Sequence, residues 1–119
     1  MKSISIIGVG KLGLCFGLNL EKVGYRVDGC DINKKYLTEL RNKTFISSEP
    51  GVTELLKNSE NLYLHDNLEK TLENNVIFVV VHTPSLPNGK YDHQYIEGLK
   101  EKLISLGVQK HTKHLVINC

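Results

Sequence analysis

The chain has 119 residues, of which 40% are hydrophobic and 24% are charged, and its formal net charge is +2. This length suits one domain, and the composition excludes an intrinsically disordered chain. The chain is too weakly basic to indicate nucleic-acid binding, and no apolar run approaches the roughly 18 residues of a membrane span. Three cysteines without metal-ligand spacing argue against a disulfide framework. Because no signal peptide is recognisable after Met1, we expect a cytoplasmic protein.

The first half of the chain predicts alternating strands and helices. Isoleucines mark a buried strand at 3–8, and the following segment, 11–23, has the pattern of a helix that is apolar on most sides and therefore buried. Gly24 suits the left-handed residue that ends such a helix, and Asn33 can cap the next one. The elements expected here are a strand at 3–8, a helix at 11–23, a strand at 25–30, a helix at 34–42 and a short helix at 50–57.

The second half continues the alternation. Asp66 and Glu69 have the spacing of a capping box for a helix that ends near Glu73. Residues 76–81 are all apolar and mostly valine, which indicates a strand buried on both faces of a parallel sheet. The other expected elements are strands at 62–64 and 115–117, a loop at 84–91 and a helix at 92–107. This order predicts an α/β fold, a Rossmann-like, doubly wound, mainly parallel sheet with helices on both faces.

A glycine-rich loop with the pattern G-x-G-x-x-G joins the first strand to the first helix. Gly8 permits a tight turn, Gly10 lets a pyrophosphate approach the backbone, and Gly13 lets the helix pack closely on the sheet. The N–H groups at the start of the helix would bind the pyrophosphate of a dinucleotide. The residues expected to contact it are Gly8, Val9, Gly10, Lys11, Leu12 and Gly13.

Asp31 ends the second strand, 18 residues beyond Gly13, where an acid can accept hydrogen bonds from the adenosine ribose. Its charge would repel a 2′-phosphate, so NAD is favoured over NADP, and Lys34 and Lys35 weaken that preference slightly. Lys11 begins the helix, where a cation opposes the helix dipole. Two interpretations stay open for Lys11: a lysine that faces solvent, or one that assists pyrophosphate binding.

Four segments together resemble the UDP-glucose/GDP-mannose dehydrogenase family, most closely its members that oxidise UDP-glucose. They are the glycine loop, VDGCDIN at 27–33, SEPG at 48–51 with TELL at 53–56, and VVVHTPSLPNGKYD at 79–92. The resemblance implies NAD as the cofactor, a nucleotide sugar oxidised to its uronate as the substrate, and a homodimer of the full-length protein. It also implies cofactor contacts from Val81, His82, Thr83 and Pro84.

The chain departs from this family at several positions. The family usually has an aromatic residue in place of Lys11, and often Lys or Arg in place of Tyr36. Its catalytic threonine, cysteine, lysine and asparagine correspond to positions beyond this sequence. The resemblance therefore implies that residues 1–119 are the NAD-binding domain, without the family's central helix and sugar-binding half. We assign no catalytic residue and expect the chain alone to bind NAD without oxidising a sugar.

Other chemistry-bearing residues have structural explanations. Cys15 and Cys30 fall within a buried helix and a buried strand, where a cysteine is usually a small hydrophobic residue. Cys119 aligns with a serine of the family and not with its nucleophile. Glu49 precedes Pro50 as a turn residue. The histidines lack partners at metal-ligand spacing, so no metal site is expected.

Two other functions stay open from the sequence. The chain could be the NAD-binding domain of a dehydrogenase of the 3-hydroxyacid or 6-phosphogluconate type, because these also begin with a glycine loop. It could also be a free-standing, non-catalytic nucleotide-binding module. The SEPG turn at 48–51 and the HTP loop at 82–84 favour the nucleotide-sugar dehydrogenase over the first alternative.

Overall fold

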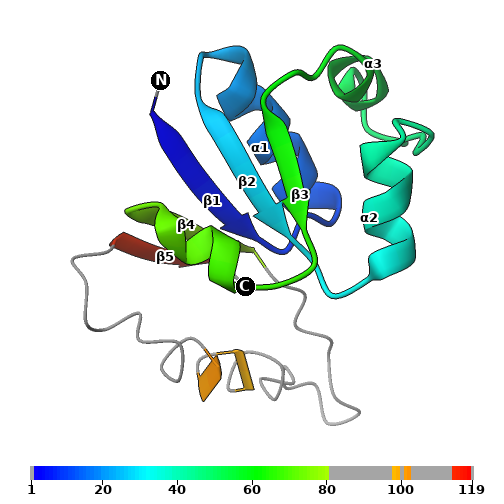
Figure 1. Cartoon of the computed structure of the whole chain (residues 1–119). Coiled ribbons are helices and arrows are strands. Elements are labelled where there is room, and N and C mark those ends of the chain that lie inside the picture. Colours follow the sequence, from blue (N-terminus) through cyan, green and yellow to red (C-terminus); the bar gives the residue numbers. More distant parts are fainter. Residues whose placement is uncertain (1, 81–97, 100, 103–113, 119) are drawn as a thin grey trace, which may run out of the picture.

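The computed structural model describes residues 2–80, 98, 99, 101, 102 and 114–118, which form a parallel β-sheet with helices packed against it (Figure 1). Residues 98, 99, 101 and 102 are helical, and the rest of the helix expected at 92–107 lies outside the described residues, as does the loop expected at 84–91. The elements, in chain order, are β1 (Ser3–Ile7), α1 (Lys11–Lys22), β2 (Arg26–Cys30), α2 (Lys34–Arg41), α3 (Val52–Lys57), β3 (Leu62–His65), the 3₁₀-helix η1 (Glu69–Glu73), β4 (Val76–Val80) and β5 (His114–Asn118).

The sheet has five strands in the order β3-β2-β1-β4-β5, and every neighbouring pair is parallel. From β1 the chain first builds outward through β2 and β3, and it then crosses back to add β4 and β5 on the other side. The carboxyl ends of β1 and β4 therefore meet at a topological switch point, where ligands of open α/β sheets bind. This order confirms the predicted Rossmann-like fold.

Both faces of the sheet are packed, because successive side chains of a strand point to opposite faces. Ile4 and Ile6 belong to the core shared with α1, α2 and α3, whereas Ile7 packs with Ile77 and Val79 on the other face. Figure 1 shows α1 behind the β1–β3 part of the sheet. In the valine-rich β4, Ile77 and Val79 are buried on one face, whereas Val76, Phe78 and Val80 are half-buried against the other core, so the predicted burial on both faces is complete on one face only.

The end of α1 has the geometry that its sequence predicts. Gly24 has a φ of +110°, the left-handed region that favours glycine. Its N–H donates to Glu21 O at 3.0 Å, and the N–H of Tyr25 donates to Leu20 O at 3.2 Å. These two bonds form a Schellman motif, which satisfies carbonyl groups of the last turn and directs the chain into β2.

Two local predictions are wrong. The first helix is not buried on most sides, because Leu12 is 58% exposed and the buried positions form one stripe: Gly13, Leu14, Gly17 and Leu18. The segment before Glu73 is a 3₁₀-helix whose N-cap is Leu68, with no side-chain cap, so Asp66 does not form the expected capping box. No helix among the described residues is long and apolar enough to cross a membrane.

Candidate cofactor site

The turn between β1 and α1 is so tight that only glycine fits at Gly13. Gly8 starts the turn with a φ of +95°, and its N–H donates to Cys30 O at 2.8 Å. A Cβ atom at Gly13 would lie 2.0 Å from Gly8 O, which is a direct overlap with backbone. The start of α1 is therefore pressed against the end of β1, as the glycine pattern predicts.

Gly10 differs from Gly13, because the space beside it is open. It is the N-cap residue of α1, with a φ of −67° and a ψ of −159°, and a Cβ atom there would meet nothing within 4 Å. No packing within the described residues thus requires glycine at this position. A ligand that lies against the backbone is a physical reason for the missing side chain.

The N-terminus of α1 is suited to an anion. Its first N–H groups have no acceptor within the helix, no side chain in the described part of the chain caps them, and the first turn contains no acidic residue. The helix dipole adds partial positive charge at the same place. The residues present therefore fit the pyrophosphate of a dinucleotide.

Asp31 is fixed beside this loop by two backbone amides. Its Oδ2 accepts a hydrogen bond from Val9 N at 3.2 Å, and its Oδ1 accepts one from Asn33 N at 3.0 Å. Each carboxylate oxygen keeps a further lone pair, which can accept a ribose hydroxyl. Asn33 in turn accepts a bond from Tyr36 N at 3.0 Å, which confirms Asn33 as the cap of α2.

Tyr36 holds the opposite side of Val9, a contact that the sequence did not indicate. Its hydroxyl donates to Val9 O at 2.6 Å, and its ring meets the Phe45 ring edge to face at 5.2 Å. Burial, together with the charges of Asp31 and Glu39, raises the pKa of Tyr36 to about 12. The N–H of Val9 is thus held by Asp31 and its carbonyl by Tyr36. The resemblance singles out this position, because the family often has Lys or Arg there, but it does not indicate the contact with Val9.

Lys11 and Glu49 form an ion pair that joins the glycine loop to the SEPG turn. Their Nζ and Oε1 atoms lie 3.0 Å apart. Glu49 does lie in a turn, since Val52 N donates to Glu49 O at 3.3 Å, but its carboxylate also reaches the first residue of α1. Sequence reasoning treated Lys11 and Glu49 separately and missed their pairing.

The described cysteines do not form a nucleophilic site. Cys30 is 4% exposed, and burial, reinforced by the charges of Asp31 and Asp66, raises the pKa of its thiol to about 11. It is therefore a protonated core residue near neutral pH, as expected. Cys15 is half-buried on α1, where its carbonyl accepts a bond from Asn19 Nδ2 at 2.8 Å.

Several expected site residues cannot be placed. Val81, His82, Thr83 and Pro84 lie outside the described residues, as does Cys119. The strand that leads into this loop, β4, ends at Val80, beside β1 in the sheet. Within the described part of the chain, no group of three or more His, Cys, Asp or Glu side chains could hold a metal ion.

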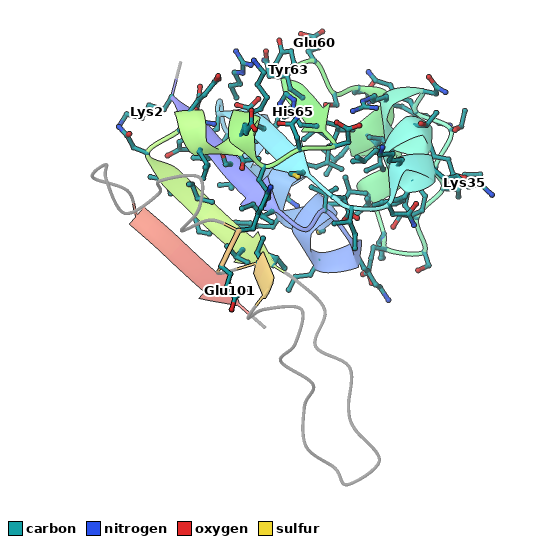
Figure 2. The ribbon with its side chains drawn as sticks, turned by 60° about the horizontal axis from the view of Figure 1, so that its bottom comes forward. Lys2, Lys35, Glu60, Tyr63, His65 and Glu101 are labelled. Carbon is teal, nitrogen blue, oxygen red and sulfur yellow. The ribbon has the colours of Figure 1, made fainter. Side chains whose placement is uncertain are left out.

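A second polar cluster lies away from the glycine loop, around Asp28 in the middle of β2. Asp28 Oδ1 lies 2.9 Å from His65 Nε2 and 3.3 Å from Arg26 Nη2. Its Oδ2 accepts a bond from Asn74 Nδ2 at 2.9 Å. The guanidinium of Arg26 also lies 4.3 Å from the ring centroid of Tyr63, and Figure 2 shows Tyr63 and His65 next to each other on β3. We call these residues the Asp28 cluster.

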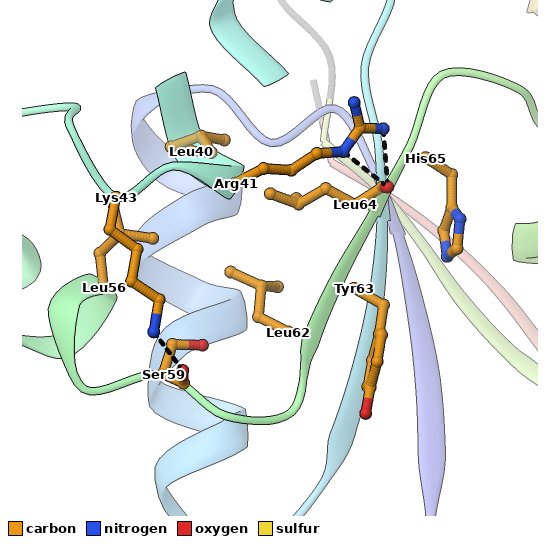
Figure 3. Close-up of a pocket in the computed structure, with 9 residues that line it drawn as sticks. All are labelled: Leu40, Arg41, Lys43, Leu56, Ser59, Leu62, Tyr63, Leu64 and His65. Atoms are coloured by element: carbon orange, nitrogen blue, oxygen red, sulfur yellow. Dashed lines mark hydrogen bonds between the residues drawn. The ribbon is translucent and has the colours of Figure 1, made fainter. Parts of the chain in front are cut away.

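A pocket of about 290 Å³ lies between β3 and the helices α2 and α3 (Figure 3). Leucines line much of it, and Arg41 and Lys43 stand at its edge. The side chain of Arg41 donates to Leu64 O at 2.9 Å, and Lys43 Nζ donates to Ser59 O at 2.6 Å. Both cations thus bind backbone carbonyls of β3 and the turn before it, so the pocket presents no unpartnered cation to a ligand.

Comparison with known proteins agrees with this geometry. A family model described as the NAD-binding domain of the UDP-glucose/GDP-mannose dehydrogenase family matches residues 2–118. UDP-N-acetyl-D-mannosamine dehydrogenase of Methanococcus vannielii is 37% identical over 89 residues, which are 72% of this chain and 20% of that protein. UDP-glucose 6-dehydrogenase TuaD of Bacillus subtilis is 28% identical over 101 residues, 82% of this chain and 22% of that protein.

A solved structure gives the same result. A ternary complex of GDP-mannose dehydrogenase from Pseudomonas aeruginosa superimposes with a TM-score of 0.85 and 28% identity, covering 98% of this chain and 28% of that one. The chain thus spans 20% to 28% of the length of these relatives. The family match, the sheet order and the glycine loop agree, and the chain belongs to the UDP-glucose/GDP-mannose dehydrogenase family as its NAD-binding domain.

Proposed function

We propose that the chain binds NAD along the glycine loop and Asp31, for an enzyme that oxidises the primary alcohol of a nucleotide sugar. The pyrophosphate lies at the N-terminus of α1, and Asp31 accepts hydrogen bonds from the adenosine ribose. We also propose cofactor contacts from Val81, His82, Thr83 and Pro84, which follow β4 in the sequence. Bound NAD supplies the hydride acceptor, and the residues of this chain hold and orient it.

The observation that carries this proposal is the contrast between the glycines of the loop. Gly13 is required by the protein itself, because a Cβ atom there would overlap Gly8 O at 2.0 Å. Gly10 has nothing within 4 Å of its Cβ position, so the described protein does not require it. The N-terminus of α1, which is suited to an anion, begins directly after that open position.

The substrate class is proposed from the relatives. Those named above carry UDP-N-acetyl-D-mannosamine, UDP-glucose and GDP-mannose in their names, so the feature they share is a nucleotide sugar. The family match favours this class over a 3-hydroxyacid or 6-phosphogluconate substrate. We further propose that residues 1–119 form one cofactor-binding unit and that the full-length protein forms a homodimer.

Isothermal titration of NAD into the chain tests the cofactor site. We expect saturable binding to the unchanged chain and at least tenfold weaker binding to Gly10→Val, because its branched side chain would occupy the space of the pyrophosphate. The matched control is Gly98→Val, since a Cβ at Gly98 also meets nothing within 4 Å among the described residues. Thermal unfolding followed by circular dichroism checks that both variants are folded. Equal NAD affinity in the folded Gly10 and Gly98 variants would show that the pose is wrong.

Turnover separates the binding role from catalysis. With UDP-glucose and NAD, the chain alone should produce no NADH detectable by absorbance at 340 nm (a wavelength set by the reduced nicotinamide). NADH formation would instead assign catalysis to this chain. Saturable NAD binding without turnover is also compatible with a free-standing binding module, and adding the sugar-binding part of a relative distinguishes the two by restoring or not restoring activity.

A further inference from the structure

The pairing of Lys11 with Glu49 places a carboxylate beside the proposed pyrophosphate site. Lys11 is the first residue of α1, and its side chain is 70% exposed. Glu49 Oε1 lies 3.0 Å from Lys11 Nζ and comes from a segment 38 residues further along the chain. The fold thus joins two motifs whose functions the sequence left separate.

Glu49 is held in place by a turn with several internal bonds. Its N–H donates to Ser47 Oγ at 3.0 Å, and Ser47 N donates to Thr53 Oγ1 at 2.9 Å. Gly51, with a φ of +81°, is the N-cap of α3. These bonds hold the backbone of Glu49 in the turn, and its carboxylate reaches the first residue of α1.

The charges of this pair act on an anion in opposite directions. Lys11 attracts a pyrophosphate bound at the helix terminus, and Glu49 repels it. Paired together, they nearly cancel at that site. The same pair also explains how a cation is tolerated at the first residue of a helix, since the carboxylate offsets its unfavourable interaction with the dipole.

We propose that Glu49 sets the NAD affinity of the loop by competing with the cofactor pyrophosphate for Lys11. In the free chain Lys11 is paired with Glu49, and in the bound chain it turns toward the phosphates. This inference rests on the proposed NAD site, and it assigns Glu49 a role in cofactor affinity beyond that of a turn residue. It also gives Lys11 a function beyond that of a lysine that faces solvent.

A double-mutant cycle that removes each charge in turn tests the competition, because the two single variants should change NAD affinity in opposite directions. The variants are Glu49→Gln, Lys11→Gln and the double variant, each titrated with NAD by calorimetry at low salt. We expect Glu49→Gln to bind NAD about two- to fivefold more tightly, because Lys11 is released to the pyrophosphate, and Lys11→Gln to bind it more weakly by a similar factor. The double variant should bind like the unchanged chain, because the local charge is again balanced.

Two controls restrict the effect to the phosphates. Titration with adenosine, which lacks phosphate, should give one affinity for all four proteins, whereas ADP should reproduce the order seen with NAD. At 0.5 M salt the differences should largely disappear, since exposed charges are then screened.

The proposal is overturned if folded Glu49→Gln binds NAD no more tightly than the unchanged chain, or if adenosine shows the same differences as NAD. Failure of the NAD site itself looks different. In that case the unchanged chain shows no NAD binding at all, and the loop is not the cofactor site. Thermal unfolding of each variant confirms that the comparison is made between folded proteins.

Discussion

Two aspartates, one in β2 and one just after it, lie three residues apart, but their carboxylates have different hydrogen-bond partners. Asp28, in the middle of the strand, is 5% exposed, and side chains from β2, β3 and the turn before β4 surround it. Asp31, just past the carboxyl end, accepts hydrogen bonds from the main-chain N–H groups of Val9 and Asn33 and from no side chain of the described residues. The first carboxylate is surrounded by protein side chains, whereas the second is fixed by backbone and faces the glycine loop.

The pKa of Asp28 shows which influence prevails in the buried cluster. Burial raises it, but the hydrogen bonds with His65 and Asn74 and the charge of Arg26 outweigh burial and lower it below its ordinary value of 3.8. Asp28 is therefore a charged structural residue. The comparison teaches that an acid's partners, more than its residue type or strand, distinguish a structural carboxylate from one available to a ligand.

The largest expected effect is on stability, at Asp28. Asp28→Asn replaces the charged acceptor with an amide that cannot accept all the present donors, and we expect the free energy of unfolding to fall by about 2–3 kcal/mol. Urea unfolding followed by circular dichroism measures this. Under native conditions the folded variant should keep its NAD affinity. A loss of affinity without a loss of stability would reverse the roles given to the two aspartates.

The next effect is on binding, at Asp31. Asp31→Ala removes the ribose acceptor and frees Val9 N–H, so we expect NAD affinity to fall about tenfold, which corresponds to about 1.4 kcal/mol. Discrimination against NADP should weaken, because the repulsion of a 2′-phosphate is removed. Calorimetric titration with both cofactors measures this. Unchanged affinity and unchanged discrimination would place the adenosine ribose elsewhere.

The pH dependence of the free energy of unfolding tests whether Asp28 is charged in the folded protein. A carboxyl group whose pKa is lowered by folding stabilises the protein above its unfolded pKa, and this stability is lost as the pH falls through the folded pKa. For Asp28 the loss begins near the ordinary value of 3.8 and continues below it. The stability difference between the unchanged chain and Asp28→Asn should therefore shrink as the pH falls through 3.8 and below it, measured by urea unfolding. A difference that stays constant over this range would contradict a charged Asp28 in the folded state.

The smallest effect is expected at Tyr36. Tyr36→Phe keeps the ring against Phe45 and removes only the hydroxyl that donates to Val9 O. We expect the free energy of unfolding to fall by about 1 kcal/mol and NAD affinity to fall about two- to threefold, because Val9 O loses its bond and only Asp31 still holds Val9. The affinity for NAD relative to NADP should stay unchanged, since Asp31 is intact. A change in that ratio would mean that Tyr36 itself contacts the ribose.

Much of the secondary structure depends on local sequence and could be predicted from the order of the residues. The alternating isoleucines of β1, the valine-rich β4, Gly24 at the end of α1 and Asn33 at the start of α2 each impose a backbone state that depends on near neighbours. The predictions at Asp66 and Leu12 are wrong because they too rest on near neighbours alone. A capping-box spacing and an apolar side chain indicate what a segment can do, whereas packing against the sheet decides whether it does so.

The amino-acid sequence by itself determined the order of strands and helices, the glycine turn and the family. Only the tertiary structure decided which distant groups meet: Tyr36 with Val9, Lys11 with Glu49, and Asp28 with His65 and Asn74. The physical reason is range. Backbone propensity and steric fit act over a few residues, but hydrogen bonds and ion pairs between separate elements depend on how the sheet and helices are placed in space.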